Sequence, residues 1–151
     1  MVAQKNKAFW ASMVILGAVF LVGFASKQDF SGNIVQGSLG GEVLVLEVAD
    51  TPTLRERGLS GHQPLGPNEG MLFVFPTDSR YGFWMKEMTF PIDSIWLDAD
   101  YHIVDVWRSA DPASYPLVVE PRTPARYAVE LTSGFFENHH LQMGNILEIA
   151  R

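Results

Sequence analysis

The sequence of 151 residues contains no cysteine. Disulfides, a thiol nucleophile, a thiolate metal site and a lipid attached to an N-terminal cysteine are therefore excluded. Basic residues are also scarce, since 11 lysines and arginines stand against 17 aspartates and glutamates. A chain with this net charge of −6 gains nothing from a phosphate backbone, so nucleic acid is not an expected partner. Stability must come from a hydrophobic core, which a chain of this length can supply.

Charged residues are also missing from one long apolar stretch near the N-terminus, the 19 residues 8–26. A secretory signal core has about 7–15 apolar residues and a membrane-spanning helix about 20, so this length favours an uncleaved transmembrane anchor. Gly23 and Ala25 are small enough to precede a cleavage site, which leaves a cleaved signal and secretion as the alternative. Lys5 and Lys7 orient the N-terminus toward the cytoplasm. The sequence thus predicts a membrane-anchored domain outside the cytoplasm, periplasmic or extracellular.

Composition divides the chain into an anchor or signal segment (1–26), a polar, glycine-containing linker (27–40) and an exported domain (41–151). Two short helices are expected, one between Thr51 and Gly58 and one that Ser133 and Gly134 open. Apolar, β-branched runs bounded by turn residues predict strands at 42–48, 71–75, 82–88, 92–97, 102–107, 126–131 and 145–149. This pattern predicts a mainly β fold, a compact β-sandwich or partly closed barrel. The proline-rich segment 108–125 is either a lid or a stiffened crossover.

Several short motifs follow one another in a fixed order along this domain. They are Ala49-Asp50-Thr51-Pro52, Arg57-Gly58-Leu59, Gly70-Met71-Leu72-Phe73-Val74-Phe75, Phe83-Trp84-Met85-Lys86, Pro91-Ile92-Asp93, the stretch 127–131 and Gly144-Asn145-Ile146. With them the chain resembles the domain of unknown function 192 family over roughly residues 41–149. The resemblance implies a jelly-roll-like β-sandwich or barrel in an exported or membrane-anchored prokaryotic protein. It implies no catalytic residue.

The predicted strand 82–88 holds the first candidate site residues. Side chains alternate along a strand, so Trp84 and Lys86 are expected on one face. Trp84 is then either a stacking platform beside a cation, suited to a sugar ring or a small anionic group, or a side chain packed under a loop. Arg57 ends the first predicted helix, where a cation also suits the helix dipole. Asp93 begins a strand and is expected either to form an ion pair with Arg57 or Lys86 or to act in acid–base chemistry.

Groups for hydrolytic or metal chemistry are few. His139 and His140 are adjacent, so on a helix they diverge by about 100° and do not easily share one metal. Met85 and Met88 stand three apart in a predicted strand and point to opposite faces, which argues against a Cu(I) site. Glu130 faces away from the apolar side of its strand, where it is either solvated or lines a cleft. No metal and no cofactor are predicted.

The sequence therefore favours a non-enzymatic binding module for a small polar or anionic ligand or a glycan of the cell envelope. Its predicted site consists of Arg57, Trp84, Lys86 and Asp93. One alternative is an enzyme of unknown class in which Lys86 and Asp93 carry protons. A second is an interaction domain that docks on an envelope protein.

Overall fold

The computed structural model describes residues 33–150, so the predicted anchor or signal segment lies outside the described residues. No helix within residues 33–150 is long and apolar enough to cross a membrane. The elements in chain order are β1 (Ile34–Leu39), β2 (Glu42–Ala49), α1 (Pro52–Arg57), β3 (Glu69–Ser79), β4 (Ile92–Leu97), β5 (Ile103–Ala110), η1 (Pro112–Ser114), β6 (Ala125–Thr132), α2 (Phe135–Asn138) and β7 (Glu148–Ile149).

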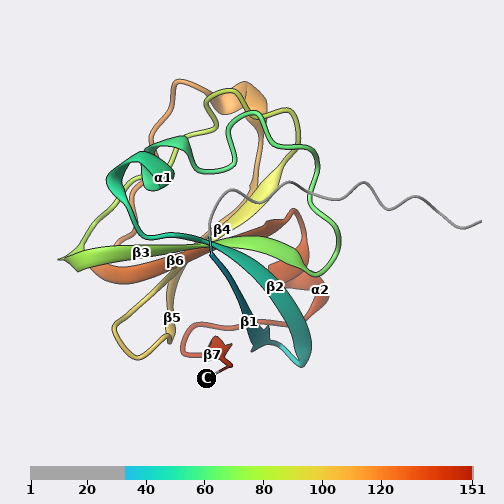
Figure 1. Cartoon of the computed structure of the whole chain (residues 1–151), viewed down its shortest axis with the longest axis vertical. Coiled ribbons are helices and arrows are strands. Elements are labelled where there is room, and N and C mark those ends of the chain that lie inside the picture. The colour runs from blue at the N-terminus through green and yellow to red at the C-terminus, as the bar shows by residue number, and fades with distance from the viewer. Residues whose placement is uncertain (1–32, 151) are drawn as a thin grey trace, which may run out of the picture.

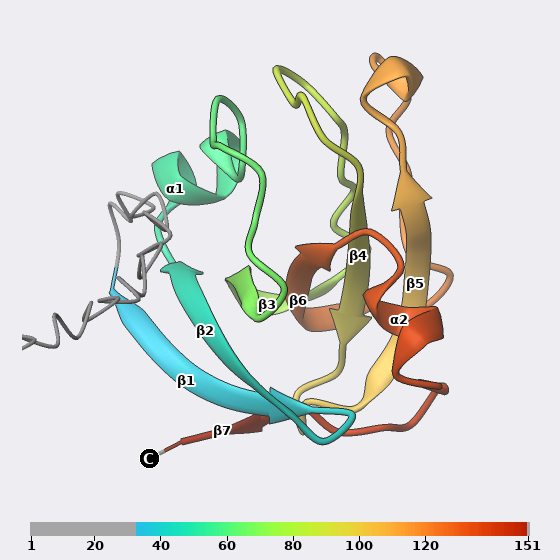
Figure 2. The same cartoon turned by 90° about the vertical axis from the view of Figure 1, so that its right-hand side faces the viewer.

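The strands form one mixed sheet in the order β5-β4-β6-β3-β2-β1-β7. The β2–β3 pair is parallel and the other pairs are antiparallel. A parallel pair needs a long connection, which here runs through α1 and the loop after it. The sheet is strongly curled, with the β1–β2 and β4–β5 hairpins on opposite sides of the β3–β6 pair (Figures 1 and 2).

The mainly β class and the two short helices are confirmed, but the sheet is a single open one. Two strands of a closed barrel would pair along their length where the sheet meets itself. Here β7 has two residues, and the chain just before it reaches the other end of the sheet through one isolated bridge, His102 to Ile146. The C-terminal segment therefore runs from one end of the sheet to the other, but it does not form the continuous strand pairing that would close a barrel.

Strand β1 occupies residues that the sequence assigned to the linker. It pairs with β2 through the turn at Gly40 and Gly41, whose φ angles are +64° and +86°. A tight hairpin turn with positive φ at both central residues favours glycine, and this pair of glycines supplies it. Leu39 at the end of β1 is buried in the core. The prediction of a linker was wrong for residues 34–39, because the polar residues and the glycine of β1 hide the strand pattern when the segment is considered by itself.

The predicted strand 82–88 is wrong too. Phe83 forms an isolated bridge with Val119, and the chain then turns, with the Met88 N–H donating to the Met85 carbonyl at 3.3 Å. Glu87 has a φ of +56°, which takes the backbone out of any extended conformation. The segment 108–125 contains some regular secondary structure, because β5 extends to Ala110 and η1 follows it.

Alternation along the strands separates two hydrophobic clusters, one on each face of the sheet. In β3, Leu72 belongs to the cluster covered by α2 and the C-terminal segment. Its neighbours Met71 and Phe73 belong to the other cluster, which α1 and the loops on either side of β3 cover. The second face carries the candidate site.

Candidate ligand-binding site

The end of α1 and the turn at residues 85–88 are held together by two hydrogen bonds. The Ser60 hydroxyl donates to the Lys86 carbonyl at 2.7 Å, and the Gly61 N–H donates to the Glu87 carbonyl at 3.1 Å. The helix ends at Gly58, whose φ of +51° turns the chain toward this contact. Residues far apart in sequence thereby meet at one end of the molecule.

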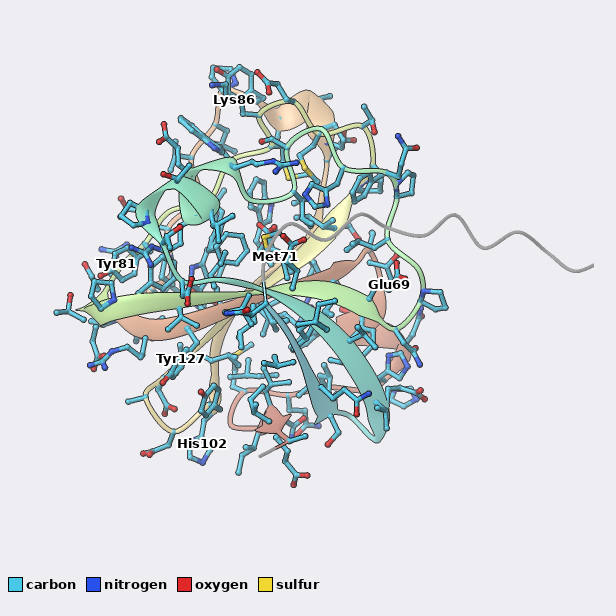
Figure 3. All side chains as sticks on the ribbon, in the orientation of Figure 1. Glu69, Met71, Tyr81, Lys86, His102 and Tyr127 are labelled. Atoms are coloured by element: carbon cyan, nitrogen blue, oxygen red, sulfur yellow. The ribbon has the colours of Figure 1, made fainter. Side chains whose placement is uncertain are left out.

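A groove of about 400 Å³ opens where these two segments meet. Its lining residues are Thr53, Glu56, Arg57, Ser60, Trp84, Lys86 and Glu87. Three of the four predicted site residues, Arg57, Trp84 and Lys86, thus lie together. Figure 3 shows Lys86 at the end of the molecule beyond α1, opposite His102.

Trp84 is the aromatic surface of the groove. Its side chain is 41% exposed, and the Lys86 Nζ atom lies 5.7 Å from its ring centroid. The Tyr115 ring meets it edge to face at 6.2 Å between centroids. The predicted juxtaposition of Trp84 and Lys86 therefore exists, although a turn and not a strand produces it.

A smaller cavity of about 20 Å³ adjoins the groove, and Glu56, Arg57, Ser60 and Trp84 line both. Much of its remaining wall is apolar, formed by Leu59, Phe73, Phe83, Met88 and Ile92. Glu130 is the carboxyl group from the sheet that lines it. A space of this size is sufficient for one water-sized group.

Glu130 is buried, with 4% of its surface exposed. The Ser94 hydroxyl, directly across in the β4–β6 register, donates to its Oε1 at 3.5 Å. Burial raises the pKa of the Glu130 carboxyl to about 8, against the opposing effect of the Ser94 hydrogen bond. At neutral pH the native protein therefore holds this carboxyl mainly protonated. Of the two sequence expectations for Glu130, solvated or lining a cleft, the structure shows a buried residue that lines a cavity.

His62 lies close to two charged residues, Glu47 and Arg57, and its pKa is lowered from the ordinary value. Burial lowers the pKa of His62, the charge of Glu47 raises it, and the charge of Arg57 lowers it. Glu47 is itself 1% exposed, and its register partner Met71 pairs in turn with Glu130. Glu47 and Glu130 thus belong to one cross-strand row beneath the groove, on the same face of the sheet.

Asp93, the fourth predicted site residue, lies away from the groove and is fully buried. Its Oδ1 accepts hydrogen bonds from the backbone N–H groups of Ser109 (2.7 Å) and Gly134 (3.2 Å), and its Oδ2 accepts one from Phe136 (2.9 Å). These three amides take the place of the expected pairing with Arg57 or Lys86. The carboxylate joins β4 to the end of β5 and the start of α2, whose N–H groups would otherwise lack an acceptor.

Within residues 33–150, no three His, Asp or Glu side chains are grouped so that they could hold a metal ion. The chemistry available in the groove is accordingly that of an aromatic face, two cations, two carboxylates and two hydroxyls. In the cavity, the side chains of Glu130 and Arg55 join those of Glu56, Arg57 and Ser60, which line both spaces.

These features define a mainly β domain with a groove at the loop end of one open sheet. The chain belongs to the domain of unknown function 192 (DUF192) family, whose model matches residues 35–149 and is described as an uncharacterized ACR. No curated protein matches the chain.

Two crystal structures are similar to it. One is a Sinorhizobium meliloti protein, provisionally described as a transcription regulator, with a TM-score of 0.70 and 29% identity over 77% of this chain and 92% of that one. The other is a Novosphingobium aromaticivorans protein of unknown function, with a TM-score of 0.69 and 23% identity over 76% of this chain and 82% of that one. The second likeness shows the fold alone.

Proposed function

We propose that the chain is a non-enzymatic binding module and that the groove takes a small polar ligand, best a sugar ring of a glycan. The observation that carries this proposal is the exposed Trp84 ring with the Lys86 ammonium 5.7 Å from its centroid. An exposed aromatic face stacks on the apolar face of a sugar, while neighbouring polar groups bind its hydroxyls.

The groove suits a neutral polyhydroxylated ligand better than a simple anion. Arg57 and Lys86 attract negative charge, but Glu56 and Glu87 line the same groove and oppose it. Sugar hydroxyls both donate and accept hydrogen bonds, so they match a lining that contains cations, carboxylates and hydroxyls.

We also propose that residues 8–26 hold the domain at a membrane, outside the cytoplasm. The uncharged length of that segment and the lysines before it support this proposal. Its ligand would then be a glycan of the cell envelope.

The enzymatic alternative uses Lys86 and Asp93 as proton carriers, with at least one of them buried in a cleft. Asp93 is buried, but its carboxylate accepts three backbone hydrogen bonds and does not line the groove, so the binding module is the better supported proposal. The role described for the Sinorhizobium meliloti protein is not carried over, because an acidic chain is a poor match for DNA.

A glycan array with the full chain in detergent, followed by affinity measurements on the hits, tests the proposal. We expect Trp84→Ala and Lys86→Ala each to weaken binding at least fivefold, because each removes a central contact. Val43→Ala serves as the control, since Val43 is exposed but lies outside the groove lining. If both groove variants bind every hit as tightly as the unmodified protein, the groove is not the binding site. A crosslinking pull-down from membranes that recovers one consistent envelope protein would favour the docking alternative.

A further inference from the structure

We propose that the cavity beside Glu130 is a subsite for one hydroxyl group of the sugar bound in the groove. This inference rests on the proposed function and adds to it the residue that selects the sugar. It makes Glu130 a specificity-determining residue.

The first support is continuity between the two spaces. Four residues line both groove and cavity, among them Arg57 at the end of α1 and Trp84 in the loop after β3. A ring stacked on Trp84 therefore lies at the entrance of the cavity, and a substituent on the edge of that ring points inward.

The second support is size. The groove, at about 400 Å³, takes a sugar ring, whereas the cavity, at about 20 Å³, takes one water-sized group. A hydroxyl fits this space. An acetamido, carboxylate or phosphate group has several heavy atoms and does not.

The third support is the hydrogen-bonding state of Glu130. Ser94 donates to its Oε1, which leaves the protonated oxygen to donate to a ligand. Burial keeps the pKa of Glu130 near 8, so this proton is present at neutral pH. Apolar side chains form much of the wall around the carboxyl, and the other polar side chains of the lining, Arg55, Glu56, Arg57 and Ser60, come from α1 and the residues just after it. Binding a sugar hydroxyl thus requires no extra proton and no change of charge in the protein.

Isothermal titration of the full chain in detergent with methyl α-glucoside, methyl α-mannoside and methyl α-galactoside, and with their monodeoxy analogues, tests the subsite. For the best-binding parent we expect one deoxy analogue to bind about tenfold more weakly, because it leaves the Glu130 carboxyl unpaired. Glu130→Leu should bind the parent about tenfold more weakly and no longer distinguish it from that analogue. Glu130→Gln, which keeps the size and a donor, should still distinguish them.

A pH series gives a second readout that does not require the leucine variant to fold. Above pH 8 Glu130 ionises and accepts a hydrogen bond from the ligand hydroxyl instead of donating one, so the discrimination of the unmodified protein should change with pH while that of Glu130→Gln stays constant. Both proteins share the other charged groups near the carboxyl and at the entrance, which are Arg55, Glu56, Arg57, Glu47, His62, Lys86 and Glu87. A difference between the two profiles therefore belongs to Glu130.

The outcomes separate the two proposals. If Trp84→Ala abolishes binding but Glu130→Leu distinguishes the deoxy analogue as the unmodified protein does, the subsite is overturned and the groove stands. The subsite is also overturned if the two pH profiles coincide. If none of the sugars binds the unmodified protein, the groove and the subsite are overturned together.

Discussion

The carboxyl of Glu130 occupies an environment in which ionisation is costly. It lies on a sheet face among aromatic and aliphatic side chains, and its one hydrogen-bond partner within residues 33–150 is the Ser94 hydroxyl. A hydroxyl at 3.5 Å stabilises a carboxylate far less than water does. The native protein therefore favours the protonated form, which makes its stability depend on pH.

We expect Glu130→Gln to remove this dependence. Because the pKa of Glu130 is about 8 when folded and near its ordinary 4.5 when unfolded, its favourable effect is complete below pH 4.5 and lost as pH rises through 8. The loss across that window is on the order of several kcal/mol. Urea unfolding at pH 5, 7 and 9 should show a fall in free energy for the unmodified protein that is much smaller for Glu130→Gln. The exposed Glu148→Gln is the control, and parallel curves for Glu130→Gln and the unmodified protein would contradict the expectation.

Individual site residues could be predicted from sequence to different extents. Trp84 and Lys86 are recognisable candidates by residue type, and the structure brings them together with Arg57. Their proximity was predicted from a strand at 82–88, but a turn produces it. Asp93 was grouped with them by residue type alone. Its role in accepting three amides depends on where β5 and α2 end, which no local pattern gives. Glu130 did carry a signal, an acidic residue within an apolar strand, but its burial depends on α1 and the loops that cover it.

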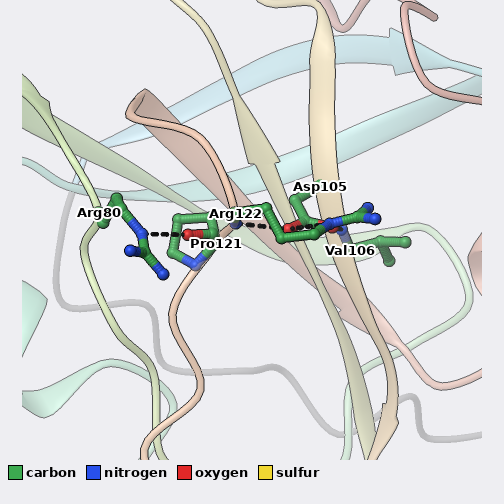
Figure 4. Close-up of polar contacts among 5 residues, drawn as sticks. All are labelled: Arg80, Asp105, Val106, Pro121 and Arg122. Atoms are coloured by element: carbon green, nitrogen blue, oxygen red, sulfur yellow. Dashed lines mark hydrogen bonds and ion pairs between the residues drawn. The ribbon is translucent and has the colours of Figure 1, made fainter.

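At the scale of elements, the segment between β5 and β6 lies beside the groove, where its Tyr115 ring contacts Trp84, and it is held from two sides. Asp105 accepts hydrogen bonds from the Arg122 N–H (2.7 Å) and from the Arg122 side chain at Nη2 (2.7 Å) and Nε (3.0 Å) (Figure 4). On the other side, the Arg80 Nε donates to the Pro121 carbonyl at 2.6 Å. Val119, in the same segment, exchanges both backbone hydrogen bonds with Phe83, next to Trp84. We call the contacts of Asp105 with Arg122 and of Arg80 with Pro121 the clamp. Because Val119 pairs with Phe83, the clamp also stabilises the backbone beside Trp84.

We expect Asp105→Asn to loosen this segment and to lower the free energy of unfolding by about 1.5–3 kcal/mol, the range for hydrogen bonds to a charged group. Partial burial raises the pKa of Asp105, but the bonds from Arg122 and the Val106 N–H outweigh it, so that pKa lies below its ordinary value. The stabilisation is therefore present above about pH 4 and lost as pH falls through the lowered pKa.

Amide hydrogen exchange gives the local readout for the clamp. The Val119 amide should exchange faster in Asp105→Asn, while that of Leu72 in the central strand changes only through global unfolding. Asp78→Asn, which removes an ion pair with Arg126 whose carboxylate is more exposed than that of Asp105, is the matched control. Unchanged exchange at Val119 would show that the bridge to Phe83 holds the segment without the clamp.

The elements that sequence predicted correctly are those whose local pattern agrees with their tertiary position. The helix between Thr51 and Gly58 has both of its ends encoded, since the Thr51 hydroxyl accepts from the Leu54 N–H and Gly58 takes a positive φ. The strands 42–48 and 92–97 are apolar runs with a clear length. The errors at β1 and at 82–88 have the opposite cause, because there pairing partners and a turn override local propensity.

At the scale of the whole molecule, β1 shortens the expected linker. The sequence predicted a linker at residues 27–40, but β1 begins at Ile34. Only residues 27–33 therefore lie between the apolar segment and the sheet. Seven residues span at most roughly 25 Å even when fully extended. If residues 8–26 anchor the chain, as we propose, the start of the sheet stays within about that distance of the bilayer, and the groove samples ligands near the membrane surface.

The absence of cysteine makes the anchor directly testable. We expect the full chain to stay in membranes washed with alkaline carbonate and deletion of residues 8–26 to release it, because only that segment is long and apolar enough to span. In intact cells expressing the chain, Val43→Cys should react with a membrane-impermeant maleimide, since Val43 is 60% exposed in the domain. Val2→Cys should react only after lysis, because in the proposed orientation Lys5 and Lys7 keep that end in the cytoplasm. Release of the full chain by carbonate would disprove the anchor. If the mature protein no longer contains the N-terminal segment with Val2→Cys, the segment is instead a cleaved signal. If Val43→Cys is protected from the maleimide in intact cells, the proposed orientation is reversed.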